Sequence, residues 1–117
     1  MRYFSSLDFI NASPSCSMQD MSIETLTMLD NAREIAGVPF IVNSAFRTVA
    51  HEKSRGRDGR SSHTSGKAVD IRTTNSQNRF LILKALIEVG FTRIGIHKSF
   101  IHADNDPKKS PEVVWLY

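Results

Sequence analysis

The stretch Ser61–Asp70 constrains the fold of this chain most, because it joins a loop to a strand through a glycine. Gly66 interrupts any helix at this point and permits a sharp turn of the backbone. The next residues, Lys67–Arg72, alternate as a strand does, so that every second side chain points to the same face as Asp70. A turn at Gly66 would therefore allow the imidazole of His63 and the carboxylate of Asp70 to meet on one face of a sheet.

A second histidine, His102, lies in the strand-like run Phe100–Asp104. Alternation along this run places His102 and Asp104 on the same face, with their Cα atoms roughly 7 Å apart. Two histidines and one carboxylate form a zinc site with three protein ligands, which leaves one position open for water, as in catalytic zinc sites. Taken alone, however, His63 and Asp70 are better explained as a surface histidine beside a solvated aspartate.

Three helices are predicted from capping residues and apolar spacing. The first begins after Ser22 and ends at Gly37, the second begins near Thr48, and the third runs from about residue 76 to about residue 89. The predicted apolar stripe of the first comprises Ile23, Leu26, Leu29, Ala32 and Ile35. That of the third comprises Phe80, Leu83, Leu86 and Ile87.

Strands are predicted at residues 40–43, 67–72, 91–96, 100–104 and 113–117. Helices and strands in this order indicate an α+β fold with a small, largely antiparallel sheet on which the helices pack. The length of 117 residues is that of a single domain, 1–117. The candidate zinc site would lie on one face of the sheet.

Composition limits the partners of the chain without choosing one. The net charge of +3 comes from 15 basic and 12 acidic residues, and much of the excess lies in Lys53–Arg60. Such a run suits an anionic partner such as cell wall, nucleic acid or acidic lipid, and a solvated basic loop explains it equally well. No nucleic-acid-binding motif accompanies it, so nucleic acid is not an expected partner. Cys16 is the only cysteine, which leaves N and O atoms as the metal ligands.

No apolar run approaches the ~18 residues of a membrane span. The N-terminus also lacks the charged and then apolar pattern of a secretory signal. We therefore expect a monomer without a membrane span, made in the cytoplasm without a signal peptide. If its target is the cell wall, it would act there after release or export.

Three motifs in order along the chain carry a resemblance to a known family. The pattern Ser61-x-His63-x-x-Gly66-x-Ala68-x-Asp70 resembles the signature of the zinc D-Ala-D-Ala peptidases, which include the VanX and VanY types and phage endolysins. Asn43–Thr48 resembles the family stretch that ends in a substrate-binding arginine, and Phe100–Asp104 resembles its last metal-ligand strand. The fold of this family is shared with lysostaphin-type enzymes and the hedgehog signalling domain.

The resemblance implies a set of roles. His63, Asp70 and His102 would be the ligands of Zn²⁺, and Arg47 would pair with the carboxylate of a peptide stem through its guanidinium fork. The alternative for Arg47 is a surface salt bridge. The implied activity is hydrolysis of peptide bonds in peptidoglycan stem peptides, by a carboxypeptidase or an endopeptidase such as an endolysin.

One position departs from the family pattern. Many members carry an acid three residues before the last zinc histidine, where it acts as general base, and this chain has Ser99 there. We expect His97 to stabilise or protonate the tetrahedral intermediate. Asp104 would contribute to the base role or orient His102, and both remain open. The departure also supports an alternative function, a catalytically silent zinc domain that binds a partner or the cell wall.

Overall fold

The structure, a computed structural model, describes residues 1–117 and contains one five-stranded sheet in the order β1-β2-β4-β3-β5. Neighbouring strands are antiparallel except β3 and β5, which are parallel. The strands are β1 (Val42–Ser44), β2 (Ala68–Arg72), β3 (Arg93–Ile96), β4 (Phe100–Asp104) and β5 (Val113–Leu116). The predicted α+β fold with a largely antiparallel sheet is confirmed, although the predicted first strand at residues 40–43 begins two residues later.

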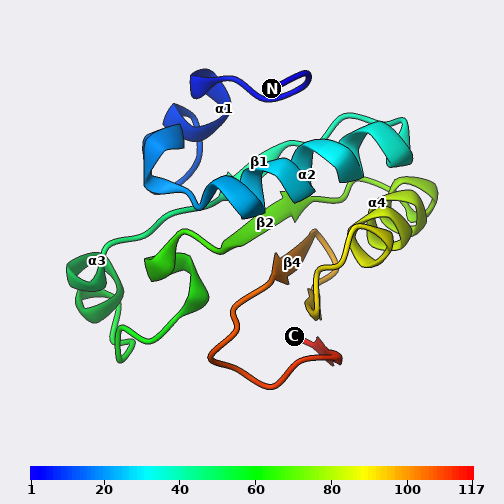
Figure 1. Ribbon diagram of the computed structural model, residues 1–117. Coiled ribbons are helices and arrows are strands. Elements are labelled where there is room, and N and C mark those ends of the chain that lie inside the picture. Colours follow the sequence, from blue (N-terminus) through cyan, green and yellow to red (C-terminus); the bar gives the residue numbers. More distant parts are fainter.

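Four helices accompany the sheet: α1 (Ser6–Ile10), α2 (Ile23–Ala36), α3 (Val49–Ser54) and α4 (Ser76–Glu88). Single turns of 3-10 helix occur at η1 (Met18–Asp20) and η2 (Ser62–Ser65). The two long helices, α2 and α4, pack against each other and against the same face of the sheet, whereas α3 lies at the far end of the molecule from α4 (Figure 1). No helix combines the length and apolar character that crossing a lipid bilayer requires.

The ends of α2 follow from its capping residues, as predicted. The Ser22 side chain accepts a hydrogen bond from the backbone N–H of Thr25, and Gly37 ends the helix with a φ of 70°. The predicted apolar stripe is wrong at both ends, because Ile23 and Ile35 are exposed. Residues spaced by three rotate about 60° per step around a helix of 3.6 residues per turn, so a run of five such residues cannot stay on one face.

The stripe predicted for α4 is wrong for a related reason. Phe80 and Ile87 are exposed, and the buried positions are Ile82, Ala85 and Leu86. Ile82, Ala85 and Leu86 follow the i, i+3, i+4 spacing that keeps side chains on one helix face. Several stripes can be drawn through a helix this rich in apolar residues, and only packing against the sheet selects one.

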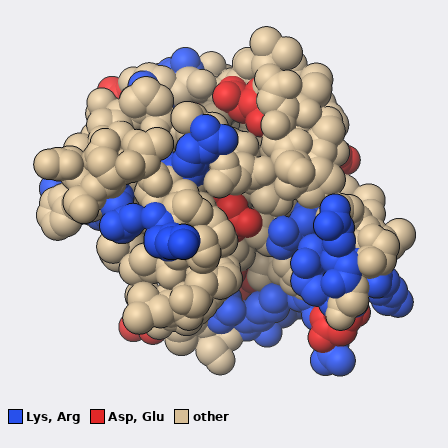
Figure 2. Space-filling view, turned by 180° about the vertical axis from the view of Figure 1, so that it is seen from behind, with Lys and Arg blue, Asp and Glu red and all other residues tan.

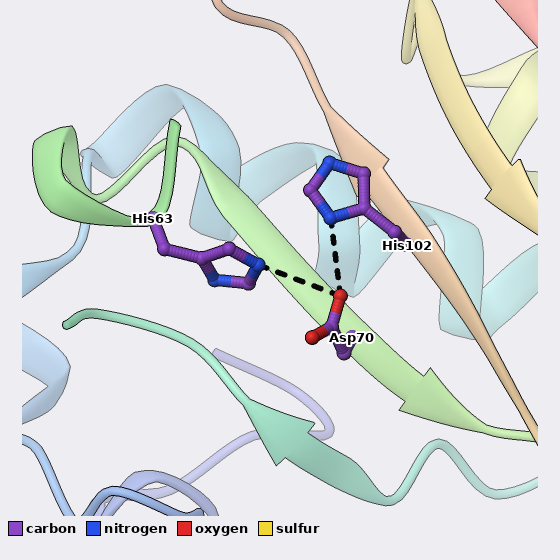
Figure 3. A group of neighbouring side chains, drawn as sticks. All are labelled: His63, Asp70 and His102. Carbon is purple, nitrogen blue, oxygen red and sulfur yellow. Dashed lines mark hydrogen bonds and ion pairs between the residues drawn. The ribbon is translucent and has the colours of Figure 1, made fainter. Parts of the chain in front are cut away.

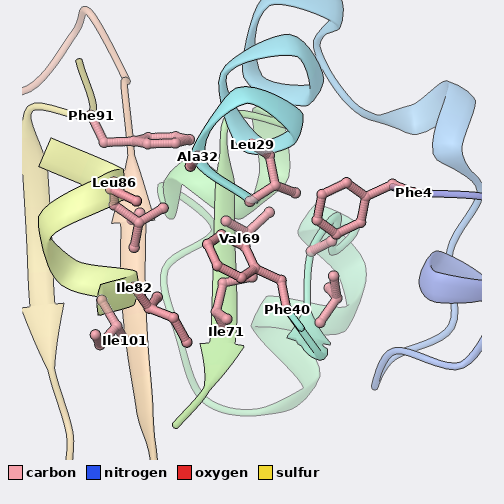
Figure 4. Close-up of a cluster of buried hydrophobic side chains, with 14 of the residues drawn as sticks. Phe4, Leu29, Ala32, Phe40, Val69, Ile71, Ile82, Leu86, Phe91 and Ile101 are labelled. Atoms are coloured by element: carbon pink, nitrogen blue, oxygen red, sulfur yellow. The ribbon is translucent and has the colours of Figure 1, made fainter. Parts of the chain in front are cut away.

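The hydrophobic core lies between the two long helices and the sheet (Figure 4). Its side chains include Leu29 and Ala32 from α2, Ile82 and Leu86 from α4, Val69 and Ile71 from β2, and Ile101 from β4. Because side chains alternate along a strand, the residues between these core positions point to the opposite face of the sheet. That opposite face carries Asp70 and His102.

Candidate metal centre

Three side chains from separate elements converge on the sheet face away from the helices (Figure 3). His63 comes from η2, Asp70 from β2 and His102 from β4. Asp70 Oδ1 lies 3.4 Å from His63 Nε2 and 3.1 Å from His102 Nδ1. One donor atom from each residue lies within 4.8 Å of the other two. The structure thus brings together the three residues that the sequence predicted as metal ligands.

Strand register accounts for the position of two of these residues. Asp70 lies directly opposite His102 in the antiparallel pair of β2 and β4, so their side chains project side by side from one face. The neighbouring pair, Ala68 opposite Asp104, belongs to the same face, and Ala68 is fully buried. A register shift of one residue would turn Asp70 to the core.

The loop before β2 brings His63 to the same point. Ser61 caps η2 by accepting a hydrogen bond from the His63 backbone N–H at 3.2 Å. Gly66 then turns the chain with a φ of 70°, and a Cβ atom there would lie 2.4 Å from the backbone oxygen of Asp20. Both the conformation and the close approach therefore require glycine. The Ser62 hydroxyl donates to Asp106 Oδ2 at 2.8 Å and ties η2 to the segment after β4.

In each histidine, the ring nitrogen that faces away from Asp70 already has a hydrogen-bond partner. His63 Nδ1 lies 2.6 Å from the backbone oxygen of Ala45, and His102 Nε2 lies 2.6 Å from Asp104 Oδ2. Both partners are acceptors, so in the neutral rings Nδ1–H of His63 and Nε2–H of His102 donate. His63 Nε2 and His102 Nδ1 then carry lone pairs directed at Asp70. Two oriented imidazole nitrogens and one carboxylate oxygen fit zinc.

The charges of the donor set favour a carboxylate at Asp70. Burial would raise the pKa of Asp70, but hydrogen bonds from His102 and His63 outweigh burial and hold that pKa far below its usual range. For His102, burial alone would lower the pKa, but the contacts with the carboxylates of Asp104 and Asp70 outweigh burial and raise that pKa. A divalent cation would take the place of the protons that these contacts otherwise hold, because metal ligands bind in their deprotonated form.

Asp104, predicted as a base or as an orienting residue, lies behind His102. It is 1% exposed, and its Oδ2 accepts from His102 Nε2, the ring nitrogen that does not face Asp70. Its Oδ1 lies 3.1 Å from Arg93 Nε and accepts from the Asp106 backbone N–H. Both oxygens are therefore engaged within the protein.

His97, the other predicted catalytic residue, lies at the edge of the site. Its ring stacks on Phe100 with centroids 4.6 Å apart, and its Nδ1 contacts both the backbone N–H and the hydroxyl of Ser99. Phe100 borders the metal site, and His97 does not. The role predicted for His97 remains a prediction.

A cleft of about 330 Å³ opens over the three donors. It is lined by Arg47, Arg57, Ser61, His63, Asp70, Phe100, His102 and Tyr117. Asp70 is the only acid in this lining. The Trp115 ring lies beside the site, with its centroid 5.3 Å from that of the His102 ring.

Arg47 reaches the cleft from the turn after β1. Its Nε lies 2.9 Å from Oε1 of Glu52, its Nη1 lies 3.4 Å from the Ser44 hydroxyl, and its backbone N–H donates to the His63 carbonyl. Glu52 is fully buried, so the ion pair is not the surface salt bridge that was the alternative for Arg47. Arg57 pairs with the same carboxylate. Sequence reasoning missed Arg57, because the run Lys53–Arg60 gave no sign that one of its arginines folds back to the site.

One known protein family matches most of the chain. The sequence profile of one family, described as Peptidase M15, matches residues 6–104. The match includes the three donors and Arg47 and ends at the last residue of β4. Comparison with curated protein sequences returns no match.

Proposed function

The chain belongs to the peptidase M15 family, the zinc D-Ala-D-Ala peptidases, and we propose that it hydrolyses peptide bonds in peptidoglycan stem peptides. The proposed reaction is that of a D-Ala-D-Ala carboxypeptidase or of an endopeptidase such as an endolysin. One observation carries the proposal: two imidazole nitrogens and a carboxylate oxygen converge at the floor of a cleft, each imidazole oriented by an acceptor behind it.

Zinc held by His63, Asp70 and His102 would act as a Lewis acid that polarises the scissile carbonyl and lowers the pKa of water. The chain itself supplies the orientation of the substrate. Arg47 presents its guanidinium to the cleft, where the fork geometry suits a peptide carboxylate. Its ion pair with the buried Glu52 fixes the side chain before substrate binds.

We assign Asp104 to positioning rather than to proton transfer. Its two oxygens are occupied by His102, Arg93 and a backbone N–H, and it does not line the cleft. A carboxylate in this position fixes the tautomer of the histidine and raises its basicity toward a metal. The proton required by the leaving amine is then assigned to His97, whose ring stacks on Phe100, a residue of the cleft lining.

A second candidate function is a zinc domain that binds a stem peptide without cutting it. The observation that favours it is the absence of a second acid in the cleft, since Asp70 is the only carboxylate in the lining and Ser99 stands at the position of the family base. In that case Arg47 and the donors would serve recognition alone.

Cleavage assays on purified, zinc-loaded protein separate the two functions. Peptidoglycan fragments and synthetic stem peptides would be incubated with and without a chelator, and products identified by mass spectrometry. The proposed function predicts release of D-alanine or of shorter peptides that stops in chelator and returns with added zinc. Stem peptides that bind the zinc-loaded protein but stay intact would show the second function instead.

A further inference from the structure

A second hollow, of about 290 Å³, lies beside the metal-site cleft and shares Arg47 and Arg57 with it. Its lining consists of Ser13, Pro14, Arg47, His51, Arg55 and Arg57, and we call it the arginine pocket. No acid and no large apolar side chain lines it. The space-filling view shows Lys and Arg side chains gathered next to a hollow on this face of the molecule (Figure 2).

One buried acid holds two of the three arginines in place. Glu52 is fully buried on α3, and its Oε1 and Oε2 pair with Arg47 and Arg57 respectively. Arg55 forms no ion pair in the structure. Three guanidinium groups thus line or border the pocket, one carboxylate is paired with two of them, and the sum of these charges is +2.

The uncompensated charge defines the ligand by its chemistry. Like charges confined to one pocket repel each other, and an anion between them relieves that repulsion. Guanidinium groups have a fork of N–H donors that matches the two oxygens of a carboxylate or of a phosphate. The pairing with Glu52 uses only Nε of each arginine, which leaves the terminal nitrogens of Arg57 for such a ligand.

We propose that the arginine pocket binds a second carboxylate of the peptide substrate, in addition to the one assigned to Arg47. Arg55 and Arg57 hold this carboxylate, and Arg47 stands between the pocket and the metal-site cleft. Preferred substrates are therefore stem peptides that carry a free carboxylate at an internal residue. This inference rests on the proposed function, since it names the substrate class of the same cleft.

A matched pair of synthetic stem peptides tests the inference. The two differ only at one internal γ-linked glutamate, whose free carboxylate is replaced in one peptide by a carboxamide. With the zinc-loaded full chain, the KM of the acid peptide should be about tenfold lower than that of the amide peptide, as expected for one charge-assisted contact. Equal KM values for the two peptides would overturn the inference.

Two variants locate the effect. Arg55→Ala should bring the KM ratio of the two peptides close to 1, because Arg55 lines the arginine pocket and not the metal-site cleft. Lys53→Ala removes a charge from an exposed residue near the end of α3 that does not line the pocket, and it should keep the tenfold ratio. A ratio unchanged in Arg55→Ala, or lowered equally in Lys53→Ala, would contradict the assignment of the pocket.

Two further measurements separate the remaining outcomes. Inorganic phosphate should compete more strongly with the acid peptide than with the amide peptide; equal competition without an acid preference would mean that the pocket holds free anions only and would overturn the inference. If neither peptide is cleaved, the proposed function fails. Calorimetric binding of the same two peptides to the zinc-loaded protein then still decides the inference, with the same tenfold preference expected.

Discussion

Asp70 and Glu52 are two acids placed alike, each between two nitrogen-bearing side chains that line the metal-site cleft. Asp70 lies between His63 and His102, and Glu52 lies between Arg47 and Arg57. Both carboxyl groups have a lowered pKa, because their hydrogen-bonded and charged partners outweigh the effect of burial. The partners make the difference between the two sites.

Histidine loses its proton near neutral pH and then offers a lone pair, whereas arginine stays protonated and offers only donors. The cluster around Asp70 can therefore exchange protons for a metal ion, and the cluster around Glu52 can only orient cations toward an anion. Exposure agrees with these roles. The Asp70 side chain is 14% exposed to the cleft, while that of Glu52 is 0% exposed.

Removing a donor should have the largest effect. His63→Ala and His102→Ala each leave two ligands, so we expect loss of bound zinc and a fall of peptidase activity to the background of the assay. Metal content by mass spectrometry and turnover on a stem peptide would be measured together. His51→Ala serves as the control, since His51 lies outside the metal-site cleft and should keep its zinc. Retention of zinc by both donor variants would place the metal elsewhere.

Arg47→Ala should separate the two clusters. It removes a cation from the Glu52 side and leaves all three donors, so zinc should remain while kcat/KM falls about 100-fold through the loss of a charged contact with substrate. Arg47→Lys keeps the charge without the fork and should recover only part of the activity. Near-normal turnover in Arg47→Ala would reduce this residue to a structural partner of Glu52.

Asp104→Asn should weaken the metal site without abolishing it. Asparagine can still accept a hydrogen bond from His102 but carries no charge, and loss of such a supporting carboxylate weakens metal affinity about 10- to 100-fold. Competition with a chromophoric chelator would measure the zinc Kd. Asp58→Asn, an exposed acid that pairs only with Arg60, is the matched control and should leave the Kd unchanged. An unchanged Kd in Asp104→Asn would contradict the positioning role.

The pH dependence of stability should reveal the smallest effect, at Glu52. Its pKa is lowered in the folded protein from the ordinary value of 4.5, since Arg57 and Arg47 outweigh the effect of burial. A carboxyl group whose pKa is lower in the folded than in the unfolded protein stabilises the fold at pH values above its unfolded pKa. That stabilisation is lost as the pH falls through its folded pKa. The difference in unfolding free energy between wild type and Glu52→Gln should thus be largest near pH 7 and shrink below about pH 4.5. Urea titrations would measure it, and a constant difference would mean that Glu52 is not ionised in the fold.

Local signals made much of the fold predictable. Ser22 and Gly37 specify the ends of α2 through contacts within a few residues, and alternation in β2 and β4 correctly placed Asp70, His102 and Asp104 on one face. The parallel pairing of β5 with β3 was not predictable in the same way. It joins segments that are about 20 residues apart, and no local pattern encodes the partner of an edge strand.

The candidate site was predictable in its donors and not in its surroundings. The three donors stand in two short motifs, Ser61–Asp70 and Phe100–Asp104, whose residue types and spacing can be recognised in the sequence. The ion pairs of Glu52 depend on how α3 and the following loop fold back onto Arg47, which residue types alone do not specify. The same holds for Asp104: alternation gave its face, but only the cross-strand position of Asp70 decides which nitrogen of His102 it contacts.

We propose that His63, Asp70 and His102 together hold one zinc ion. Anomalous diffraction from crystals of the zinc-loaded protein, recorded on both sides of the zinc absorption edge, tests it most directly. The structure predicts one strong peak at about 2.0–2.2 Å from His63 Nε2, Asp70 Oδ1 and His102 Nδ1. A peak bound to other side chains, or none at these three, would contradict the account.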